Sequence, residues 1–117
     1  MWQLPDTLRE IEEAGDESIV LELIDSFRSD TASRFEQLRD AVARLDGARV
    51  KAEAHAMRGS ASQMGAEALA ALFRAVEAGA PRRNWPELEN QVKQAEAGFA
   101  EARNAMAEFV KARVGRQ

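Results

Sequence analysis

The residues best suited to chemistry lie in one short segment, Ala54–Gly65, which reads AHAMRGSASQMG. Its His55 is the only histidine of the 117-residue chain. If the segment is helical, Arg58, Gly59 and Ser62 follow the histidine at i+3, i+4 and i+7 and therefore share its face. An imidazole nucleophile beside a fixed guanidinium charge suits an anionic group, above all a phosphoryl group.

Gly59 is the least expected member of this face. A glycine inside a helix destabilises it by about 1 kcal/mol relative to alanine, and the sequence uses alanine freely elsewhere. The missing side chain would let a bulky group approach the ring of His55. Simpler interpretations stay open from position alone: His55 could be a solvated bystander, Gly59 could allow close helix packing, and Arg58 could be an ordinary surface charge.

Composition excludes several classes of protein and site. The chain has no cysteine, so it forms neither a disulfide framework nor a thiolate metal site, and a single histidine excludes a multi-histidine zinc site. The net charge of −4 disfavours non-specific nucleic-acid binding, because neutralising phosphates needs clustered Lys and Arg. No apolar run is long enough to cross a bilayer, and residues 1–16 lack the pattern of a secretory signal. We therefore expect a soluble, cytoplasmic protein that binds neither nucleic acid nor membranes.

Helical patterns fill the chain and must position the segment around His55. Apolar residues at spacings of three and four predict a short helix over about 5–14 and longer helices over about 17–45, 48–64, 66–79 and 85–113. The apolar stripe of the first long helix comprises Val20, Leu23, Ile24, Phe27, Thr31, Phe35, Leu38, Val42 and Leu45. Short connections make neighbouring helices antiparallel. We predict a single all-α domain over 1–117, an antiparallel up-down four-helix bundle with a short additional N-terminal helix.

The segment around His55 resembles the signature of the histidine phosphotransfer (HPt) domain family, roughly A-H-x-L-K-G-S-x-x-x-x-G-A followed by leucines and a glutamate or glutamine. This chain has Ala54-His55-Ala56-Met57-Arg58-Gly59-Ser60, then Gly65-Ala66, Leu69, Leu72 and Glu77. Upstream, Phe27, Leu38-Arg39-Asp40-Ala41 and Asp46 match the family's usual second-helix pattern. The similarity covers nearly the whole chain, and the His-x-x-basic-Gly core with its downstream Gly-Ala is its most specific part.

The resemblance implies a phosphorelay and a role for each residue. His55 would accept a phosphoryl group from an aspartyl phosphate on one receiver domain and pass it to another. Arg58 stands at the family's usual lysine position, keeps the charge but not the shape, and would steady the phosphoryl oxygens. Glu77 stands where members carry a Gln or Glu that hydrogen-bonds the imidazole, fixing its tautomer and leaving the other nitrogen nucleophilic. This contact requires the helix over about 66–79 to pack beside the helix of His55.

The resemblance also implies partners and a docking surface. The partners would be response-regulator receiver domains or a hybrid histidine kinase, and the chain would act as a monomeric relay intermediate, not as an enzyme. It would need no cofactor of its own, because Mg²⁺ and the reactive aspartate belong to the receiver. The docking surface would surround His55, with Ala52, Arg58, Gly59 and Ser62 on its own helix. Leu8 and Ile11 of the short N-terminal helix would either join this surface or cap the bundle.

Two other functions remain compatible with the sequence. A bundle used only for protein binding, a pseudo-HPt module, would bind its partner without ever carrying phosphate. A phosphoacceptor domain of a chemotaxis-type kinase would share the chemistry of His55 but take its phosphoryl group directly from a kinase catalytic domain. A cofactor-binding bundle is disfavoured, because haem and di-metal sites need more ligands than one histidine.

Overall fold

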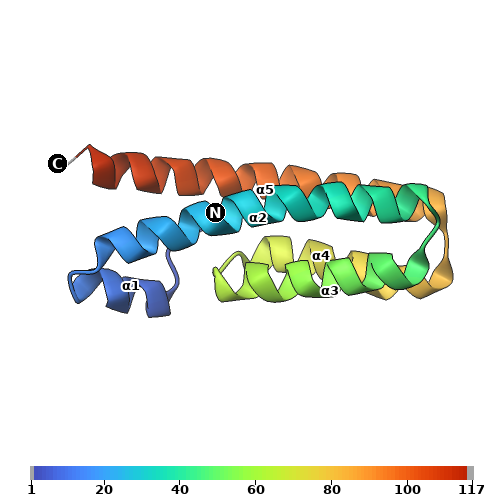
Figure 1. Cartoon of the computed structure of the whole chain (residues 1–117), viewed down its shortest axis with the longest axis horizontal. Coiled ribbons are helices and arrows are strands. Elements are labelled where there is room, and N and C mark those ends of the chain that lie inside the picture. Colours follow the sequence, from blue (N-terminus) through green and yellow to red (C-terminus); the bar gives the residue numbers. More distant parts are fainter. Residues whose placement is uncertain (1, 116–117) are drawn as a thin grey trace.

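The computed structural model describes residues 2–115, and within this range every regular element is a helix (Figure 1). The elements are α1 (Asp6–Glu13), α2 (Glu17–Ala43), α3 (Gly47–Gln63), α4 (Glu67–Gly79), the 3-10 turn η1 (Ala80–Arg82) and α5 (Trp85–Val114). The prediction of an all-α fold is confirmed. The turn η1 follows the helix predicted over about 66–79 and is not itself predicted from the sequence.

Successive long helices reverse direction and pack side by side (Figure 1). Helix α3 packs against α2 and α4, and α5 packs against α4 and α2, so that the four helices surround one interior. The molecule measures 49 × 21 × 20 Å, because α2 and α5 are much longer than the other two. They project past the end of α3, and α1 lies against the projecting start of α2 (Figure 1). This arrangement leaves one face of α3 on the outside of the molecule and turns its opposite face toward α2 and α4.

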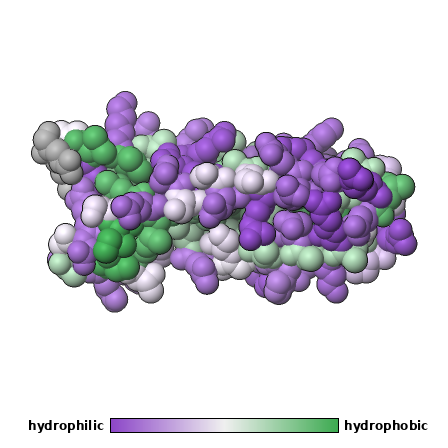
Figure 2. Space-filling view, in the orientation of Figure 1, coloured by the Kyte–Doolittle hydropathy of each residue, from purple (hydrophilic) through white to green (hydrophobic). Residues whose placement is uncertain are grey.

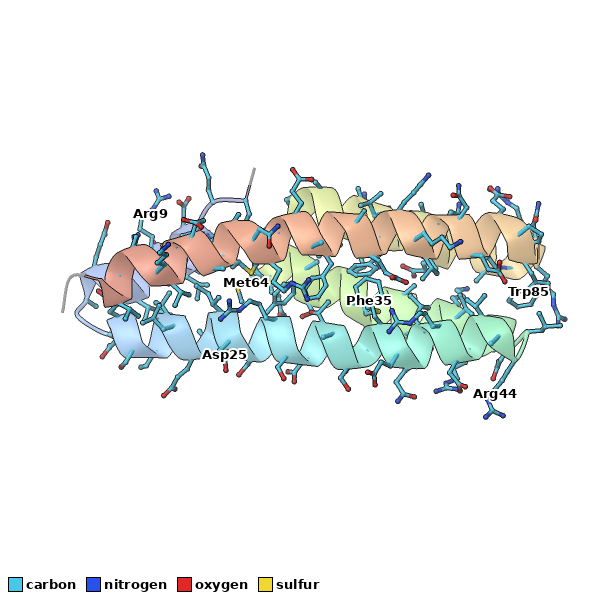
Figure 3. The ribbon with its side chains drawn as sticks, turned by 90° about the horizontal axis from the view of Figure 1, so that it is seen from above. Arg9, Asp25, Phe35, Arg44, Met64 and Trp85 are labelled. Atoms are coloured by element: carbon cyan, nitrogen blue, oxygen red, sulfur yellow. The ribbon has the colours of Figure 1, made fainter. Side chains whose placement is uncertain are left out.

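Apolar stripes meet in this interior as the sequence pattern predicts. Phe35 points inward from α2 between α2 and α5 (Figure 3), where its ring centroid lies 5.5 Å from that of Phe73 and 5.6 Å from that of Phe99. The inward stripe of α3 is buried along its whole length and consists of Val50, Ala54, Met57, Ala61 and Met64. Burial of this stripe fixes the rotation of α3 and therefore turns the face of His55 outward.

Two residues assigned to the apolar stripe of α2 lie outside it. Leu45 is 52% exposed, because α2 ends at Ala43 and the backbone of Leu45 turns into the left-handed region, with φ +56°. The side chain of Asp46 then accepts a hydrogen bond from the Arg49 N–H and caps α3. Leu23 is 40% exposed on the projecting part of α2, where the long helix has fewer neighbours.

The N-terminal segment closes the end of the short helices. The Trp2 Nε1–H donates a hydrogen bond of 2.8 Å to the carbonyl oxygen of Met64, and the Trp2 ring meets Phe109 edge to face at 5.7 Å. Gly65 has φ +74°, a conformation that glycine adopts without strain, and its Cα lies beside the Pro5 ring. Hydrophilic residues cover most of the face seen in Figure 2, and the more hydrophobic ones gather toward the end of the molecule where α1 lies.

Candidate functional site

The candidate site lies on the outer face of α3, where that helix meets α4. Three side chains of graded exposure form it: the side chain of His55 is 64% exposed, that of Arg58 30% and that of Glu77 18%. Glu77 comes from the last turn of α4, so the contact depends on α3 and α4 packing side by side, as they do. The glutamate is therefore held by the protein, while most of the imidazole faces solvent.

Glu77 contacts both other side chains through different oxygen atoms. Its Oε1 lies 2.9 Å from Nδ1 of His55, and its Oε2 accepts a hydrogen bond of 2.9 Å from Nε–H of Arg58. A second guanidinium nitrogen, Nη2, lies 3.1 Å from Nδ1 of His55. The sequence predicts a contact between Glu77 and the imidazole through the family resemblance, and this geometry agrees with it.

These distances bear on where the proton of a neutral His55 ring resides. An ionised carboxylate only accepts hydrogen bonds and a guanidinium only donates them, so Nδ1 cannot satisfy both neighbours at once. The pKa of Glu77 is lowered, first by the hydrogen bond from His55 and then by the charge of Arg58, against the opposing effect of partial burial. Glu77 is therefore ionised at neutral pH, and its carboxylate favours the tautomer in which Nδ1–H donates to Oε1 and Nε2 keeps a free lone pair.

Gly59 lies one turn beyond His55 on the exposed side of α3. A Cβ atom built at this position would have no neighbour within 4 Å, apart from the helix's own backbone. Gly98 of α5 is the opposite case, because a Cβ there would lie 2.5 Å from Cδ1 of Leu72. Close packing within the chain therefore explains Gly98 but not Gly59. The simpler interpretation of Gly59 as a packing glycine is wrong, and the open flank beside the imidazole remains.

The other residues of the expected docking surface are placed less uniformly. Ala52 is exposed and Ser62 half-buried on α3. Leu8, in contrast, is 7% exposed and belongs to the hydrophobic core, so its expected place on a docking surface is corrected. Helix α1 packs against the projecting start of α2, and this contact buries its apolar face. Ile11 is half-buried against the same core.

Two cations near the site escape the sequence analysis. Lys51 and Arg74 line a shallow groove between α3 and α4 together with Arg58, Glu77, Ala78 and Pro81. Their only sequence signal is spacing: Lys51 precedes His55 by four residues, and Arg74 precedes Glu77 by three. Exposed Lys and Arg are so common on helices that this spacing becomes informative only once the two helices are paired.

Arg58 lies on the Nδ1 side of the imidazole. Its Nε donates to Glu77 Oε2 and its Nη2 lies 3.1 Å from His55 Nδ1, so both nitrogens contact the Glu77–His55 pair. Its expected contact with phosphoryl oxygens stays a prediction. Among residues 2–115, no group of three or more His, Asp or Glu side chains is arranged to hold a metal ion, and no helix is long and apolar enough to span a membrane.

Comparison with known proteins identifies the class. Residues 22–110 match the Hpt domain, so the chain belongs to the Hpt domain family and functions in histidine phosphotransfer within phosphorelays. This confirms the resemblance drawn from the residues around His55. A comparison with curated proteins gives no match.

A solved structure supports the same assignment. Histidine-containing phosphotransfer protein B (HptB) from Pseudomonas aeruginosa PAO1 is similar to this chain, with a TM-score of 0.79 and 27% sequence identity. The similarity covers 90% of this chain and 91% of that one. It therefore extends over nearly the whole fold.

Proposed function

We propose that His55 is the phosphoacceptor of this Hpt domain and relays phosphoryl groups between aspartyl phosphates of receiver domains. One observation carries the proposal: the only imidazole of the chain is exposed, and its Nδ1 lies 2.9 Å from Glu77 Oε1, a contact that favours the tautomer with a free lone pair on Nε2. The absence of a side chain at Gly59 leaves space for the partner to approach the ring of His55. This arrangement suits a nucleophile better than a solvated bystander.

In the inward step, the lone pair of Nε2 attacks the phosphorus of the aspartyl phosphate. A P–N bond forms as the P–O bond to the aspartyl carboxylate breaks, and the carboxylate leaves with the electron pair. Positioning and charge neutralisation dominate such transfers, and a Mg²⁺ ion on the receiver would neutralise charge on the phosphoryl oxygens. Mg²⁺ is thus expected to arrive with the partner, and the chain supplies the nucleophile without being an independent enzyme.

The proposed docking surface surrounds His55 on α3. Ala52, Gly59 and Ser62 lie on or beside its exposed face, and Arg58 borders it. The long helices α2 and α5 pack against each other, α3 packs against α2 and α4, and α4 packs against α5. This set of contacts supports the finer description of the fold as an antiparallel up-down four-helix bundle, one domain over 1–117. We further propose that the protein acts in the cytoplasm as a monomer, with receiver domains or a hybrid histidine kinase as partners.

Replacement of the nucleophile tests the proposal. Wild type and His55→Gln are incubated with receiver domains from the same genome, phosphorylated beforehand with acetyl phosphate and Mg²⁺, and acid-labile phosphate on the Hpt chain is measured. We expect label on the wild type and none on the variant, with equal helix content by circular dichroism. Label that persists on His55→Gln would refute the assignment of His55. Partner binding by the wild type without any label would favour a pseudo-HPt module.

The second candidate function is a phosphoacceptor domain that takes its phosphoryl group directly from a kinase catalytic domain. If the wild type takes label from a kinase catalytic domain and ATP but from no phosphorylated receiver, the chain is the phosphoacceptor of a chemotaxis-type kinase. The two donors can be compared on the same protein sample. The result separates the donor from the chemistry at His55, which both functions share.

A further inference from the structure

A long groove follows one face of α5, beside the N-terminal segment, α1 and the start of α4. It consists of a hollow of about 850 Å³ between residues 2–4, α1 and α5, and a second hollow of about 240 Å³ between α4 and α5. Trp2 and Glu101 line both hollows, so the two adjoin. The residues of α5 that line this α5 groove extend from Gly98 to Arg113, which corresponds to about 22 Å of helix.

The floor of the α5 groove is apolar and is held in place by contacts within the chain. The Trp2 ring meets Phe109 edge to face at 5.7 Å, and the Trp2 N–H donates to the carbonyl oxygen of Met64 at 2.8 Å. Both rings are half-buried, and Ala105 and Leu72 continue the apolar lining in the larger and the smaller hollow. An apolar surface that is already ordered loses little conformational entropy when a partner covers it.

The rim of the α5 groove is negatively charged. Four of its glutamates form no ion pair with any residue in the range 2–115, namely Glu13, Glu67, Glu101 and Glu108. The two cations of the lining are already paired. Arg113 lies 2.9 Å from Glu12, and Arg9 lies 3.5 Å from Asp6. Unpaired carboxylates around an apolar floor complement a ligand that is apolar on one side and positively charged at its edges.

The dimensions of the α5 groove favour a helix as its ligand. Glu101 and Glu108 are seven residues apart on α5, which places them about two turns, or about 10.5 Å, from each other along the rim. A helix lying in the groove presents cations at the same spacing and turns an apolar face toward Trp2 and Phe109. A small molecule would occupy one of the two hollows and leave the carboxylates of the other without a partner.

We propose that the α5 groove binds a positively charged amphipathic helix of a partner protein. The proposal goes beyond phosphotransfer, because the groove and the site of His55 share no residue. His55 contacts the last turn of α4, whereas the groove meets α4 at its start. Figure 1 shows α1 and the C-terminal part of α5 together at the end of the molecule beyond α3. A partner held there leaves the imidazole free, so the chain can stay bound to one protein while it exchanges phosphoryl groups with another.

Titration with a designed peptide tests the proposal. The peptide is a helix of about 15 residues, long enough to span the groove, with leucines on one face and lysines seven residues apart at its edge; a twin carries glutamate in place of each lysine. The two indole N–H signals of ¹⁵N-labelled protein come from Trp2 and Trp85, and a Trp85→Phe variant assigns them. We expect the lysine peptide to shift the Trp2 signal but not that of Trp85, and to bind about tenfold more tightly than its twin.

Matched variants separate the rim from the floor. Glu101→Lys combined with Glu108→Lys should weaken binding of the lysine peptide about tenfold, since each reversal replaces an attraction by a repulsion. Ala105→Gln places a long uncharged side chain over the floor and should weaken binding to a similar degree. Glu89→Lys and Ala97→Gln make the same changes at exposed positions of α5 outside the groove and should stay within about twofold of the wild type. Circular dichroism checks that each variant is folded.

Phosphotransfer serves as an independent readout. The rate at which a phosphorylated receiver labels the wild type should stay unchanged when the groove is saturated with the lysine peptide. Inhibition of labelling by the bound peptide would overturn the separation of the groove from the site of His55. A wild type that takes no label from any receiver would refute the function proposed for His55, and the peptide titration would still decide on the groove.

Several results of the titration would overturn the proposal. They are an unchanged Trp2 signal in a large excess of the lysine peptide, equal binding of the two peptides, and equal binding by Ala105→Gln and Ala97→Gln. Self-association of the wild type in analytical ultracentrifugation, abolished by reversing Glu101 and Glu108, would overturn it in favour of a second copy of this chain as the occupant.

Discussion

Replacing Gly59 with alanine should make the protein more stable, and replacing it with a longer side chain should stop phosphotransfer. Position 59 lies inside α3, is exposed, and leaves room for a Cβ atom with no neighbour within 4 Å. Alanine therefore brings its higher helix propensity without a clash. The expected gain in the free energy of unfolding is about 0.5–1 kcal/mol.

The corresponding shift in melting temperature follows from the size of the chain. An unfolding entropy of about 2.1 cal/mol/K per residue amounts to roughly 0.25 kcal/mol/K for 117 residues, so Gly59→Ala should melt roughly 2–4 °C higher. Thermal unfolding followed by circular dichroism measures this shift, and urea unfolding at constant temperature gives the free energy. Gly98→Ala is the matched control, because its Cβ would lie 2.5 Å from Leu72 Cδ1 and overlap would offset the gain in propensity.

Function should change in the opposite direction from stability. Gly59→Gln keeps a good helix former at the position but places a long side chain on the flank of His55, so it should fold well and transfer poorly. Transfer from a phosphorylated receiver is the assay, with Gly98→Ala expected to react at the wild-type rate. Normal transfer by Gly59→Gln would refute the access argument. A melting temperature of Gly59→Ala at or below that of the wild type would refute the claim that the position is open.

Two further predictions concern charged contacts. Because the folded pKa of Glu77 lies below its ordinary value of 4.5, its pairing stabilises the fold fully at higher pH and is lost as pH falls through the lowered value. At neutral pH, Glu77→Gln should therefore lower the free energy of unfolding, measured by urea unfolding, by about 1–2 kcal/mol. This difference between wild type and variant should shrink in acid; a constant difference would contradict the reasoning. Arg113→Met should cost about 1–2 kcal/mol in urea unfolding, because Arg113 pairs with Glu12 at 2.9 Å and stacks on Phe109 at 3.6 Å; unchanged stability would show that these contacts contribute little.

Much of the fold could be predicted because helix periodicity is a local signal. The stripe through Ala54 and Met57 determines which side of α3 is buried, and the spacing of His55 and Gly59 then determines that they face outward together. The wrong predictions concern properties that the spacing of apolar residues along the sequence does not encode. Leu45 lies beyond the end of α2 and adopts a left-handed backbone conformation, so the prediction from its apolar character that it belongs to the buried stripe of α2 is wrong.

Pairing between helices is the other kind of information that one sequence lacks. Glu77 reaches His55 only because α4 packs beside α3 in a particular register, and here the family resemblance supplied what periodicity could not. Leu8 gives the reverse lesson. An apolar residue on a short amphipathic helix is compatible with either a core or a docking surface. Leu8 is buried in the core because α1 packs against the projecting end of α2.

The contact between the exposed ring of His55 and Glu77 also makes the site unusually easy to observe by nuclear magnetic resonance. Since the chain contains a single histidine, the imidazole nitrogen signals of a uniformly ¹⁵N-labelled sample all come from His55 and need no assignment by mutation. A proton on Nδ1 and a lone pair on Nε2 give two well-separated shifts, whereas rapid exchange between tautomers brings the two shifts together. One spectrum of the unmodified protein can therefore report which nitrogen is ready to react, before any partner has been found.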